Sequence, residues 1–579
     1  MARPRRLPAP AGVWARQWPW RWRLLLRALG GGIMTLLPEK SALLLPFREA
    51  TPAGAQPLRV GVVLGRTHPA PWMDALISFL KQLPGTDVRI LTLTGRPRAA
   101  SKRPAWLTDR LYSASRARFD PFGDLTAGGT EFVAPESVEG LRAAGCGVLV
   151  WLAACKDPNV DVGGLATHGA FTVRLGERNR VIPFWDEVAH SRATSAVTVY
   201  WHESSLADGR AVRRAETSTS QGLFLTLNAE EPLVAAIRML AGLCLELRQG
   251  GRECEERLRG FADESMEEAA HADCPTSFEA GRFVVRKLAR SAQLRWKARG
   301  KEARWFVAMR RNSGGSITDP ERLDLTGFRE VPLPRGSGEM ADPFLWEAEG
   351  RSYLLFEEVP AGSSRGRLGC MEAFEDGSCS EMKIVLQRDY HLSYPCVVPA
   401  NGELFLLPET AEAGRVDLYR FSRFPWEVEL VSSLAEGLAL ADTTPILLDG
   451  RWYFFTTTVQ PFMETLLFWA DRLDGAWNLH PGSPISGSVR NSRSAGNLFW
   501  RNGRLYRPTQ DCSVRYGYAI QVNEITRLTP AEFEERAVNW VPPAWVPGLL
   551  GTHTWNESSR LQVLDGIRLA RRAGEALSD

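Results

Sequence analysis

One sequence pattern occurs four times in the C-terminal half of the chain. Each copy has a polar start, an apolar strand, a glycine turn, an aromatic strand and a polar end. The copies read ADPFLWEAEGRSYLLFEE, SYPCVVPANGELFLLPET, ADTTPILLDGRWYFFTTT and SAGNLFWRNGRLYRPTQD, and they begin at Ala341, Ser393, Ala441 and Ser494. Their turn glycines are spaced 52, 48 and 53 residues apart, at Gly350, Gly402, Gly450 and Gly503. A repeat of about 50 residues built from short strands is typical of a β-propeller.

Two further segments predict a fifth blade. The strand WFVAMRRN precedes the first copy, and the segment His553–Ala570 follows the last one. We expect both segments to share one blade and so close the ring. Because equivalent positions of each blade face the same axis, Asp342, Asp442 and Asp511 should converge there.

The N-terminal half has a different pattern. Apolar strands such as Leu58–Gly65 and Cys146–Ala154 alternate with helical segments such as Glu230–Gln249. This alternation predicts an α/β domain whose parallel sheet is covered by helices on both faces. The predicted organisation is an extension over 1–56, the α/β domain over 57–250, a charged helical connector over 251–300 and a five-bladed propeller over 301–579.

Composition excludes several classes of function. The 579 residues include 70 basic and 67 acidic side chains, so the net charge of +3 gives no reason to expect nucleic acid as a partner. The nine cysteines are scattered and form no CxxC pair, which indicates reduced thiols in a cytoplasmic protein and no metal site.

Residues 1–56 are rich in Arg, Trp and Pro. Their most apolar run, 24–47, is broken by charges, glycines and a proline, so we do not expect it to span a membrane. The favoured interpretation is a disordered extension. The alternative is peripheral contact of this basic, Trp-bearing segment with an anionic membrane surface.

The stretch from Leu165 to Val212 resembles the formyltransferase fold of methionyl-tRNA and sugar-amine formyltransferases. The resemblance rests on His168, on the PFWDEV segment at 183–188, on the strand AVTVYW, and on Asp208 with Gly209 in a turn. It implies a Rossmann-type sheet, transfer of a formyl group from 10-formyltetrahydrofolate to an amine, and catalytic roles for His168 and Asp208.

The sequence departs from this family at one catalytic position. The family has an asparagine two residues before the histidine, and Ala166 stands there in this chain. Losing such an oxyanion donor costs about 10²–10³ in rate. His168 and Asp208 therefore have structural alternatives as ordinary turn residues.

The propeller half resembles the N-terminal domain of glucosamine inositolphosphorylceramide transferases, a domain that recurs in bacterial proteins. The most specific segment is YRPTQDCSVRYG, which begins at Tyr506, and the resemblance covers about 304–523. In the plant protein the catalytic domain follows the propeller, and nothing similar follows here. The resemblance implies a carbohydrate or glycolipid head group as partner, and it does not carry over the glycosyltransferase activity.

The propeller also resembles, more distantly, the five-bladed furanosidases and fructosidases. That resemblance implies Asp342 as base or nucleophile, Asp442 as the second aspartate and Glu409 as the acid, with Glu357 and Glu358 as substitutes. The alternative is that an aspartate at a strand start caps a turn. Further polar residues at equivalent blade positions are candidates for substrate binding: His391, Tyr394, Arg493, Arg507, Gln510, Asp511 and Arg515.

Three functions remain open at this point. The favoured one is a glycan- or glycolipid-processing enzyme, a transferase or glycosidase that uses the axial funnel of the propeller. The second is formyl transfer to an amino sugar by the N-terminal domain, with 10-formyltetrahydrofolate as the only cofactor under consideration. The third is a non-catalytic carbohydrate-binding protein.

Overall fold

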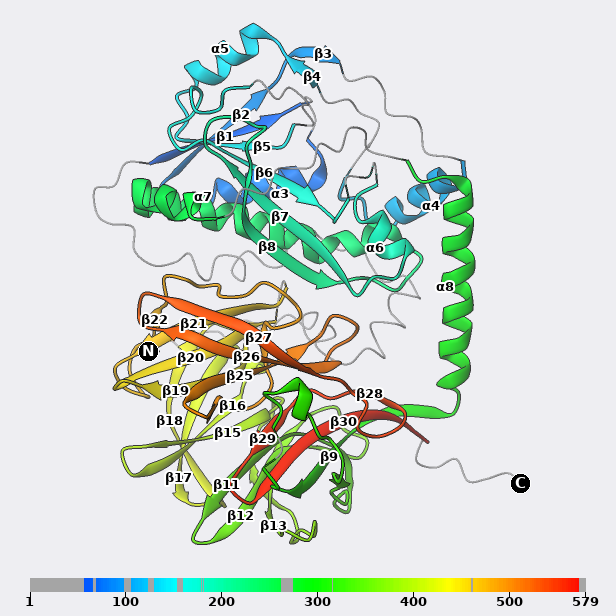
Figure 1. Cartoon of the computed structure of the whole chain (residues 1–579), viewed down its shortest axis with the longest axis vertical. Coiled ribbons are helices and arrows are strands. Elements are labelled where there is room, and N and C mark those ends of the chain that lie inside the picture. Colours follow the sequence, from blue (N-terminus) through cyan, green and yellow to red (C-terminus); the bar gives the residue numbers. More distant parts are fainter. Residues whose placement is uncertain are drawn as a thin grey trace, which may run out of the picture.

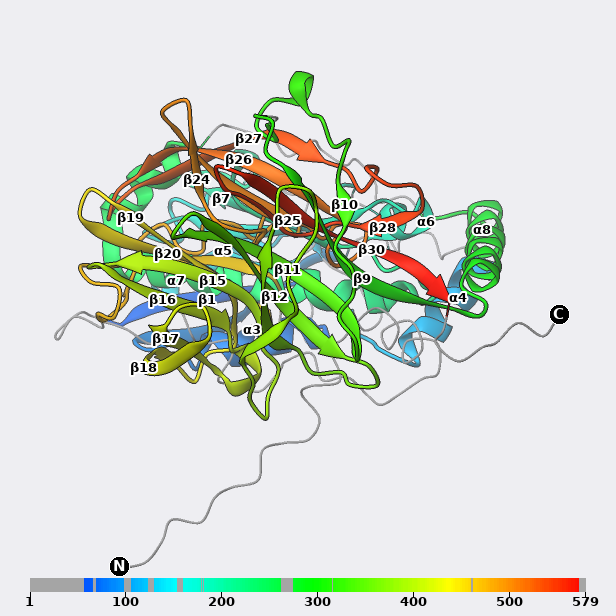
Figure 2. The same cartoon turned by 90° about the horizontal axis from the view of Figure 1, so that it is seen from below.

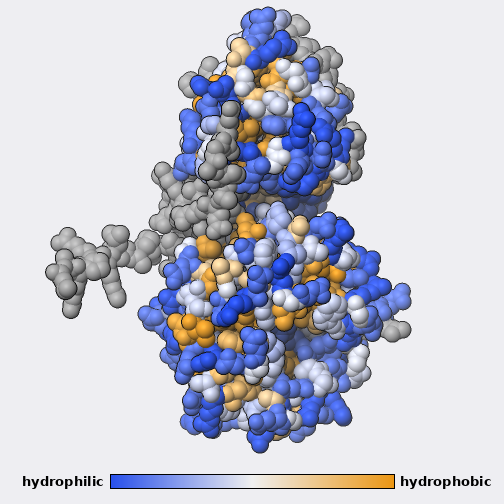
Figure 3. All heavy atoms as spheres, turned by 90° about the vertical axis from the view of Figure 1, so that its left-hand side faces the viewer, coloured by the Kyte–Doolittle hydropathy of each residue, from blue (hydrophilic) through white to orange (hydrophobic). Residues whose placement is uncertain are grey.

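A computed structural model describes residues 57–65, 69–97, 106–122, 130–153, 160–178, 180, 182–261, 274–314, 316–459 and 462–571. The predictions for residues 1–56 lie outside this part of the chain. The described residues form an N-terminal α/β domain above a β-propeller, with the long helix α8 (Ser277–Lys297) standing beside both (Figure 1). Figure 3 shows the two domains from the side as two lobes stacked along the long axis. None of the described helices is both long and apolar enough to cross a membrane.

The N-terminal sheet has six strands in the order β2-β1-β5-β6-β7-β8. Its strands are β1 (Leu58–Leu64), β2 (Thr86–Thr92), β5 (Val148–Trp151), β6 (Ala170–Leu175), β7 (Thr194–His202) and β8 (Arg210–Ser218). The first four strands are parallel, whereas β7 and β8 pair antiparallel with their neighbours. The expected parallel sheet is therefore a mixed one. A small β3 (Gly95–Pro97) and β4 (Thr130–Val133) pair lies apart from it.

Helices cover the two faces of this sheet unequally. The helices α3 (Pro71–Leu80) and α7 (Glu230–Arg259) pack on one face, and α5 (Pro135–Ala143) covers part of the other. The alternation of β1 sends Val60 and Val62 into the larger core and Val63 into the smaller one. The helices α4 (Trp106–Arg116) and α6 (Trp185–Ala189) form a third cluster with α8.

Five sheets form the blades of the propeller, which confirms the predicted five-bladed fold (Figures 1 and 2). Blade 2 contains β11 (Ser337–Ala348), β12 (Arg351–Pro360), β13 (Arg367–Ala373) and β14 (Lys383–Leu386). Blade 3 contains β15 (Ser393–Ala400), β16 (Glu403–Glu409), β17 (Arg415–Arg423) and β18 (Glu427–Glu436). Blade 4 contains β19 (Leu440–Leu448), β20 (Arg451–Thr458), β21 (Glu464–Ala470) and β22 (Asn478–Leu479). Blade 5 contains β23 (Arg493–Ser494), β24 (Phe499–Arg501), β25 (Arg504–Asp511), β26 (Ala519–Leu528) and β27 (Phe533–Val541).

Blade 1 combines strands from both ends of the propeller segment. Its outer strands are β9 (Lys301–Arg311) and β10 (Arg329–Glu330), and its inner strands are β28 (Leu549–Gly551), β29 (Trp555–Glu557) and β30 (Leu561–Arg571). The strands β9 and β30 are antiparallel along their whole length. This pairing closes the ring, as expected from the sequence.

The repeat glycines occupy the turns between the first two strands of blades 2 to 5. In each turn the preceding residue and the glycine both have positive φ, for example 49° at Asp449 and 76° at Gly450. Two consecutive positive φ values define a type I′ turn, whose twist matches that of paired strands. The glycine and its polar neighbour are therefore required by backbone geometry, which explains why the turn recurs so regularly.

Candidate active site

Three inner strands each contain one residue with an unusual backbone conformation. Asp342, Tyr394 and Asp442 have φ values of 50°, 49° and 49°, and each lies at a break in register with the next strand of its blade. Residues other than glycine rarely adopt this left-handed conformation, which occurs preferentially at functional sites. The bulges turn these side chains toward the propeller axis at the end of the strands remote from the glycine turns.

Four carboxyl groups and one guanidinium meet at this end of the axis. Asp342 and Asp442 come from the inner strands β11 and β19, whereas Glu357 and Glu409 stand near the ends of β12 and β16. Arg493 in β23 connects two of them: its Nε donates to Asp442 at 2.6 Å, and its Nη2 donates to Glu409 at 2.9 Å. The structure thus brings the predicted catalytic residues Asp342, Glu409 and Asp442 into one buried network.

Burial and mutual repulsion keep protons on this network. Burial raises the pKa of Asp342 to about 6, although the nearby His553 lowers it, while Asp442 and Asp565 raise it further. Burial also raises the pKa of Glu357 well above its ordinary value, and the neighbouring carboxylates Asp342 and Glu409 add to the effect. The pKa of Glu409 rises for the same reason, opposed by Arg493. Near neutral pH the cluster therefore combines protonated and ionised carboxyl groups.

A buried histidine extends the network into blade 1. Nδ1 of His553 lies 2.5 Å from Asp565, and its Nε2 lies 3.8 Å from Asp342. Burial opposes protonation of His553, but Asp565 and Asp342 raise its pKa overall. Trp305 stacks on the imidazole ring with a centroid distance of 4.0 Å. The sequence does not single out this group, because His553 and Asp565 belong to the closing segment, which does not repeat the pattern of the other blades.

Asp342, His553 and Asp565 are also the group of described residues best placed to hold a metal ion, since their ligand atoms lie within 4.8 Å of one another. Their hydrogen bonds favour another interpretation. Asp565 already accepts hydrogen bonds from the backbone of Asp342, His553 and Thr554, and Asp342 accepts one from the Thr554 hydroxyl at 2.7 Å. A protonated His553 between two carboxylates satisfies these charges without a cation.

Tyr394 and Phe344 pack against each other in the buried interior of the propeller. The Tyr394 hydroxyl reaches across the axis from blade 3, where it contacts Thr444 at 2.8 Å and donates to the carbonyl of Gly496 at 2.9 Å. Phe344 packs edge-on against the tyrosine ring at 4.7 Å. Tyr394 is fully buried, so its side chain is a fixed part of the propeller interior. Gln510 is also buried and donates to Asp442 at 3.2 Å.

Three other residues predicted to bind substrate, His391, Asp511 and Arg507, are each held by contacts within the protein. His391 accepts from Gly366 N at Nδ1 and lies 3.3 Å from Glu357 through Nε2; burial lowers its pKa to about 4, so the ring is neutral. Asp511 accepts from the Trp540 indole at 3.0 Å. Arg507 is buried between blades and forms a two-pronged ion pair with Glu535.

Tyr516 and Arg515 are more exposed to solvent than these buried groups. Tyr516 is 38% exposed, and the Arg493 guanidinium lies 5.0 Å from its ring centre. Arg515 is partly buried, and burial, with a contribution from Arg290 of α8, lowers its pKa. Tyr516 was not singled out in the sequence, although the YRPTQDCSVRYG segment includes it. Glu358, proposed as a substitute acid, pairs with Arg367 at 2.6 Å.

The two predicted catalytic residues of the N-terminal domain occupy different surroundings. His168 lies between β5 and β6, and its Nδ1 is 2.5 Å from Glu255 of α7. Asp208 is exposed in the turn between β7 and β8, where its carbonyl contacts His202. The carboxylate that orients His168 is therefore Glu255, not Asp208. Ala166 is 5% exposed, and it offers no donor.

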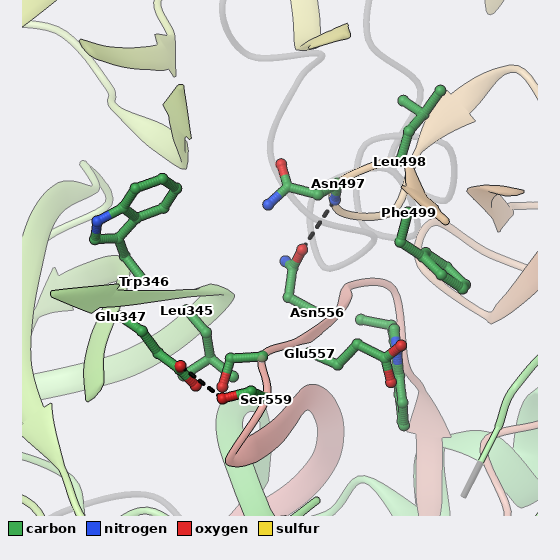
Figure 4. Close-up of a pocket in the computed structure, with 11 residues that line it drawn as sticks. Leu345, Trp346, Glu347, Asn497, Leu498, Phe499, Asn556, Glu557 and Ser559 are labelled. Atoms are coloured by element: carbon green, nitrogen blue, oxygen red, sulfur yellow. Dashed lines mark hydrogen bonds between the residues drawn. The ribbon is translucent and has the colours of Figure 1, made fainter. Parts of the chain in front are cut away.

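A second opening lies at the other end of the propeller, near the glycine turns (Figure 4). This pocket has a volume of about 370 Å³ and is lined by Trp346, Asn497, Phe499, Asn556 and Glu557, among others. Its polar groups already bond to one another: Asn556 accepts from the backbone of Asn497, and Glu557 pairs with Arg501. Glu347 also lines the pocket; burial raises its pKa, but hydrogen bonds from Ser558 and Ser559 outweigh this effect and lower it, in contrast to the raised pKa values of the axial carboxyl groups.

Comparison with known proteins relates the propeller to one family. Residues 331–574 match the family described as glucosamine inositolphosphorylceramide transferase 1, N-terminal. The chain is 30% identical over 251 residues to glucosamine inositolphosphorylceramide transferase 1 of Oryza sativa subsp. japonica, covering 42% of this chain and 33% of that protein. The corresponding protein of Arabidopsis thaliana is 30% identical over 258 residues, covering 42% and 32%.

Among solved structures, similar chains include the family 117 glycoside hydrolase Zg3597 of Zobellia galactanivorans, with a TM-score of 0.31, 10% identity, and coverage of 47% of this chain and 93% of that one. An α-L-arabinanase of Cellvibrio cellulosa has a TM-score of 0.28, 12% identity, and coverage of 34% and 78%. The chain spans about a third of the length of the curated relatives it matches. The family match is thus confined to the propeller half of the chain.

Proposed function

We propose that the axial site of the propeller binds the polar head group of a glycan or glycolipid and catalyses hydrolysis or transfer of a glycosyl group. One observation carries the proposal: Asp342, Glu357, Glu409 and Asp442 surround one point on the axis, and burial gives three of them raised pKa values. Glycosyl chemistry requires a protonated carboxylic acid and an ionised carboxylate close to the same bond.

The surroundings suggest a role for each carboxyl group. Burial and the neighbouring carboxylates all raise the pKa of Glu357, whereas Arg493 partly counteracts the rise at Glu409. Glu357 is therefore the stronger candidate for the proton donor, and Glu409 is the second. Asp342 has a pKa of about 6 and is ionised at neutral pH. It suits the base or nucleophile, while Asp442 holds Arg493 in place.

The cationic and aromatic groups indicate which ligand would fit. Arg493 and a protonated His553 suit a phosphate or another anionic substituent, and the exposed face of Tyr516 suits a sugar ring. The names of the matching relatives contain inositolphosphorylceramide and glucosamine. We therefore choose the inositol phosphate head group as the first ligand to test.

The test uses the purified full chain with inositolphosphorylceramide in detergent, nucleotide-linked sugars and aryl glycosides. Glu357→Gln should retain binding and lose at least about 10²-fold in turnover, because it cannot donate a proton to the leaving group. Glu347→Gln, at the opposite opening, is the matched control and should behave as the wild type. Unchanged turnover in both Glu357→Gln and Asp342→Asn would refute the proposal. Wild-type binding without turnover would instead support a non-catalytic carbohydrate-binding protein.

A second function rests on the pair formed by His168 and Glu255. A histidine held at 2.5 Å by a carboxylate is arranged for proton transfer, which formyl transfer to an amino sugar requires. Against it stands Ala166 in place of an oxyanion donor. The check is consumption of 10-formyltetrahydrofolate in the presence of amino sugars. Turnover that disappears in His168→Ala and persists in Glu357→Gln would assign it to the N-terminal domain.

A further inference from the structure

The helix α8 stands at the outer edge of the molecule in both ribbon views (Figures 1 and 2). It begins with a capping box, in which Thr276 and Glu279 satisfy each other's backbone groups. Its first half packs on the N-terminal domain through Ala280, Phe283 and Lys287. All residues from 288 to 297 are exposed. The second half of α8 therefore crosses to the propeller without a core of its own.

The exposed side of α8 carries an apolar stripe. Phe278 is 73% exposed, Val285 67%, Leu288 54% and Trp296 76%. These positions are 7, 3 and 8 residues apart, and at 100° per residue they fall within about 80° of one another on the helix. Phe283 and Lys287 lie on the opposite, buried side. The stripe is thus a second apolar face that the described fold does not use.

Basic residues border this stripe. The exposed side chains on α8 include Arg282, Arg286, Arg290, Arg295 and Lys297. Arg282 and Arg295 flank the stripe directly, about 40° and 20° beyond its two edges, whereas Arg290 lies on the side of Lys287. The single acidic residue of α8 is Glu279, and its carboxylate bonds to Thr276 in the cap.

An aromatic residue of the neighbouring helix adds to this surface. Trp106 at the start of α4 is 65% exposed, and Arg110 lies over its ring at 4.8 Å. Leu107, the next residue, lies beside Gly281 of α8. Aromatic and aliphatic groups bordered by arginines thus extend over two elements.

We propose that the outward face of α8, together with Trp106, docks the protein on an anionic lipid surface. The segment from Phe278 to Trp296 is about 27 Å long at 1.5 Å per residue, so it can lie flat in a bilayer interface. Its apolar side chains would enter the boundary between head groups and acyl chains, and the bordering arginines would pair with lipid phosphates and carboxylates. The near absence of acidic groups favours an anionic bilayer over a folded protein partner, whose surface normally mixes both signs. The inference is independent of the activity proposed for the propeller.

The test measures binding of the full chain to vesicles of phosphatidylcholine alone and of phosphatidylcholine with phosphatidylserine. Binding should require phosphatidylserine and weaken with added salt. The double variants Phe278→Ser/Trp296→Ser and Arg282→Glu/Arg295→Glu should each lower the partition coefficient at least about tenfold. Because all four side chains are exposed, the melting temperatures should stay close to that of the wild type.

Matched substitutions elsewhere on the surface serve as controls. Leu447→Ser/Trp500→Ser removes comparably exposed apolar groups from the propeller, and Arg311→Glu/Arg423→Glu reverses two exposed charges there. Both should bind vesicles as the wild type does. The proposal is overturned if the α8 variants bind equally well, since another segment such as 1–56 would then be responsible. It is also overturned if the wild type ignores vesicles, or if the α8 variants change only its oligomeric state, which would identify a protein interface.

Discussion

Individual ionisable residues decide how the propeller axis responds to pH. Asp342 has a pKa of about 6 in the fold, against 3.8 for an ordinary aspartate. The folded state thus holds this proton more tightly than the unfolded chain does. Asp342 therefore adds stability at low pH, and this stability is lost as the pH rises through about 6.

Asp342→Asn tests this response, because asparagine cannot lose a proton yet can still accept from Thr554. Relative to the wild type, the variant should gain stability as the pH rises from about 4 to above 6, by on the order of 1–3 kcal/mol. Thermal melts of both proteins across this range measure the change. Asp449→Asn, in an exposed turn, is the control. A difference between Asp342→Asn and the wild type that does not vary with pH would contradict the assignment.

Lys287 contributes a pH dependence of stability that has the opposite sign to that of Asp342. Its side chain is 2% exposed, and burial lowers its pKa from 10.5 to about 8, with a contribution from Arg290. The buried charge therefore destabilises the fold below pH 8, and the penalty shrinks as the pH rises toward 10.5. Lys287→Met should raise the stability at pH 7 by about 1–2 kcal/mol, seen as a higher melting temperature. Lys297→Met, at an exposed position of the same helix, should change it little.

The candidate site shows which residues a sequence can reveal. Asp342, Asp442 and Glu409 can be singled out because they occupy corresponding points of a repeat. His553 and Asp565 have no such signal, because their contacts with Asp342 join positions more than 200 residues apart. The sequence predicts a ligand-binding role for Arg507, and it gives no sign of the ion pair with Glu535, which lies on another strand.

At the scale of elements, local patterns predicted the blades better than the sheet. Each blade is a meander joined by short turns, so its pairing follows from neighbouring residues. In the N-terminal domain, alternating strands and helices suggested a parallel sheet. Residues 203–209 connect β7 and β8, however, and a connection of seven residues is too short for the crossover that parallel strands require. That signal was present in the sequence and outweighs the alternation.

Closure of the ring depends on β30. Val563 in this strand is fully buried, lies opposite Met309 of β9 and belongs to the core between blades 1 and 2. Val563→Asp should cost more than about 4 kcal/mol, because it buries a charge in an apolar core. Limited proteolysis and melting should show an open or unfolded propeller. Val431→Asp, 43% exposed on the outer strand β18, should leave both measurements nearly unchanged.

At the scale of the whole molecule, the two domains contact each other at the end of the propeller that carries the carboxyl cluster. In the edge strand β8, the backbone N–H of Glu216 donates to the carbonyl of Gly487, and the Glu216 carbonyl accepts from the N–H of Val489. Both partners lie in the connection between blades 4 and 5. Arg490 lies 3.5 Å from Glu216 and 3.4 Å from Asp511, so it links the N-terminal sheet to β25 of blade 5. A ligand held in the funnel would therefore lie next to the domain junction.

The strongest contact across this junction joins α7 to blade 4. Arg238 and Glu464 are 2.5 Å apart and each about 3% exposed, and Phe462 packs into the core of the N-terminal domain. Such a contact couples the unfolding of the two domains. Glu464→Ala removes the carboxylate from a buried arginine and should cost about 3–5 kcal/mol. In calorimetry we expect a single transition for the wild type and two separate transitions for the variant.

An exposed ion pair provides the control for this experiment. Glu403 lies 3.2 Å from Arg420 on blade 3, and both side chains are more than 40% exposed. Glu403→Ala should lower stability by less than about 1 kcal/mol and keep the single transition. The double variant Arg238→Met/Glu464→Leu should recover much of the loss, because well-packed apolar groups replace a buried pair at little cost. If Glu464→Ala melted as Glu403→Ala does, the junction would be a loose contact, and the two domains would unfold independently.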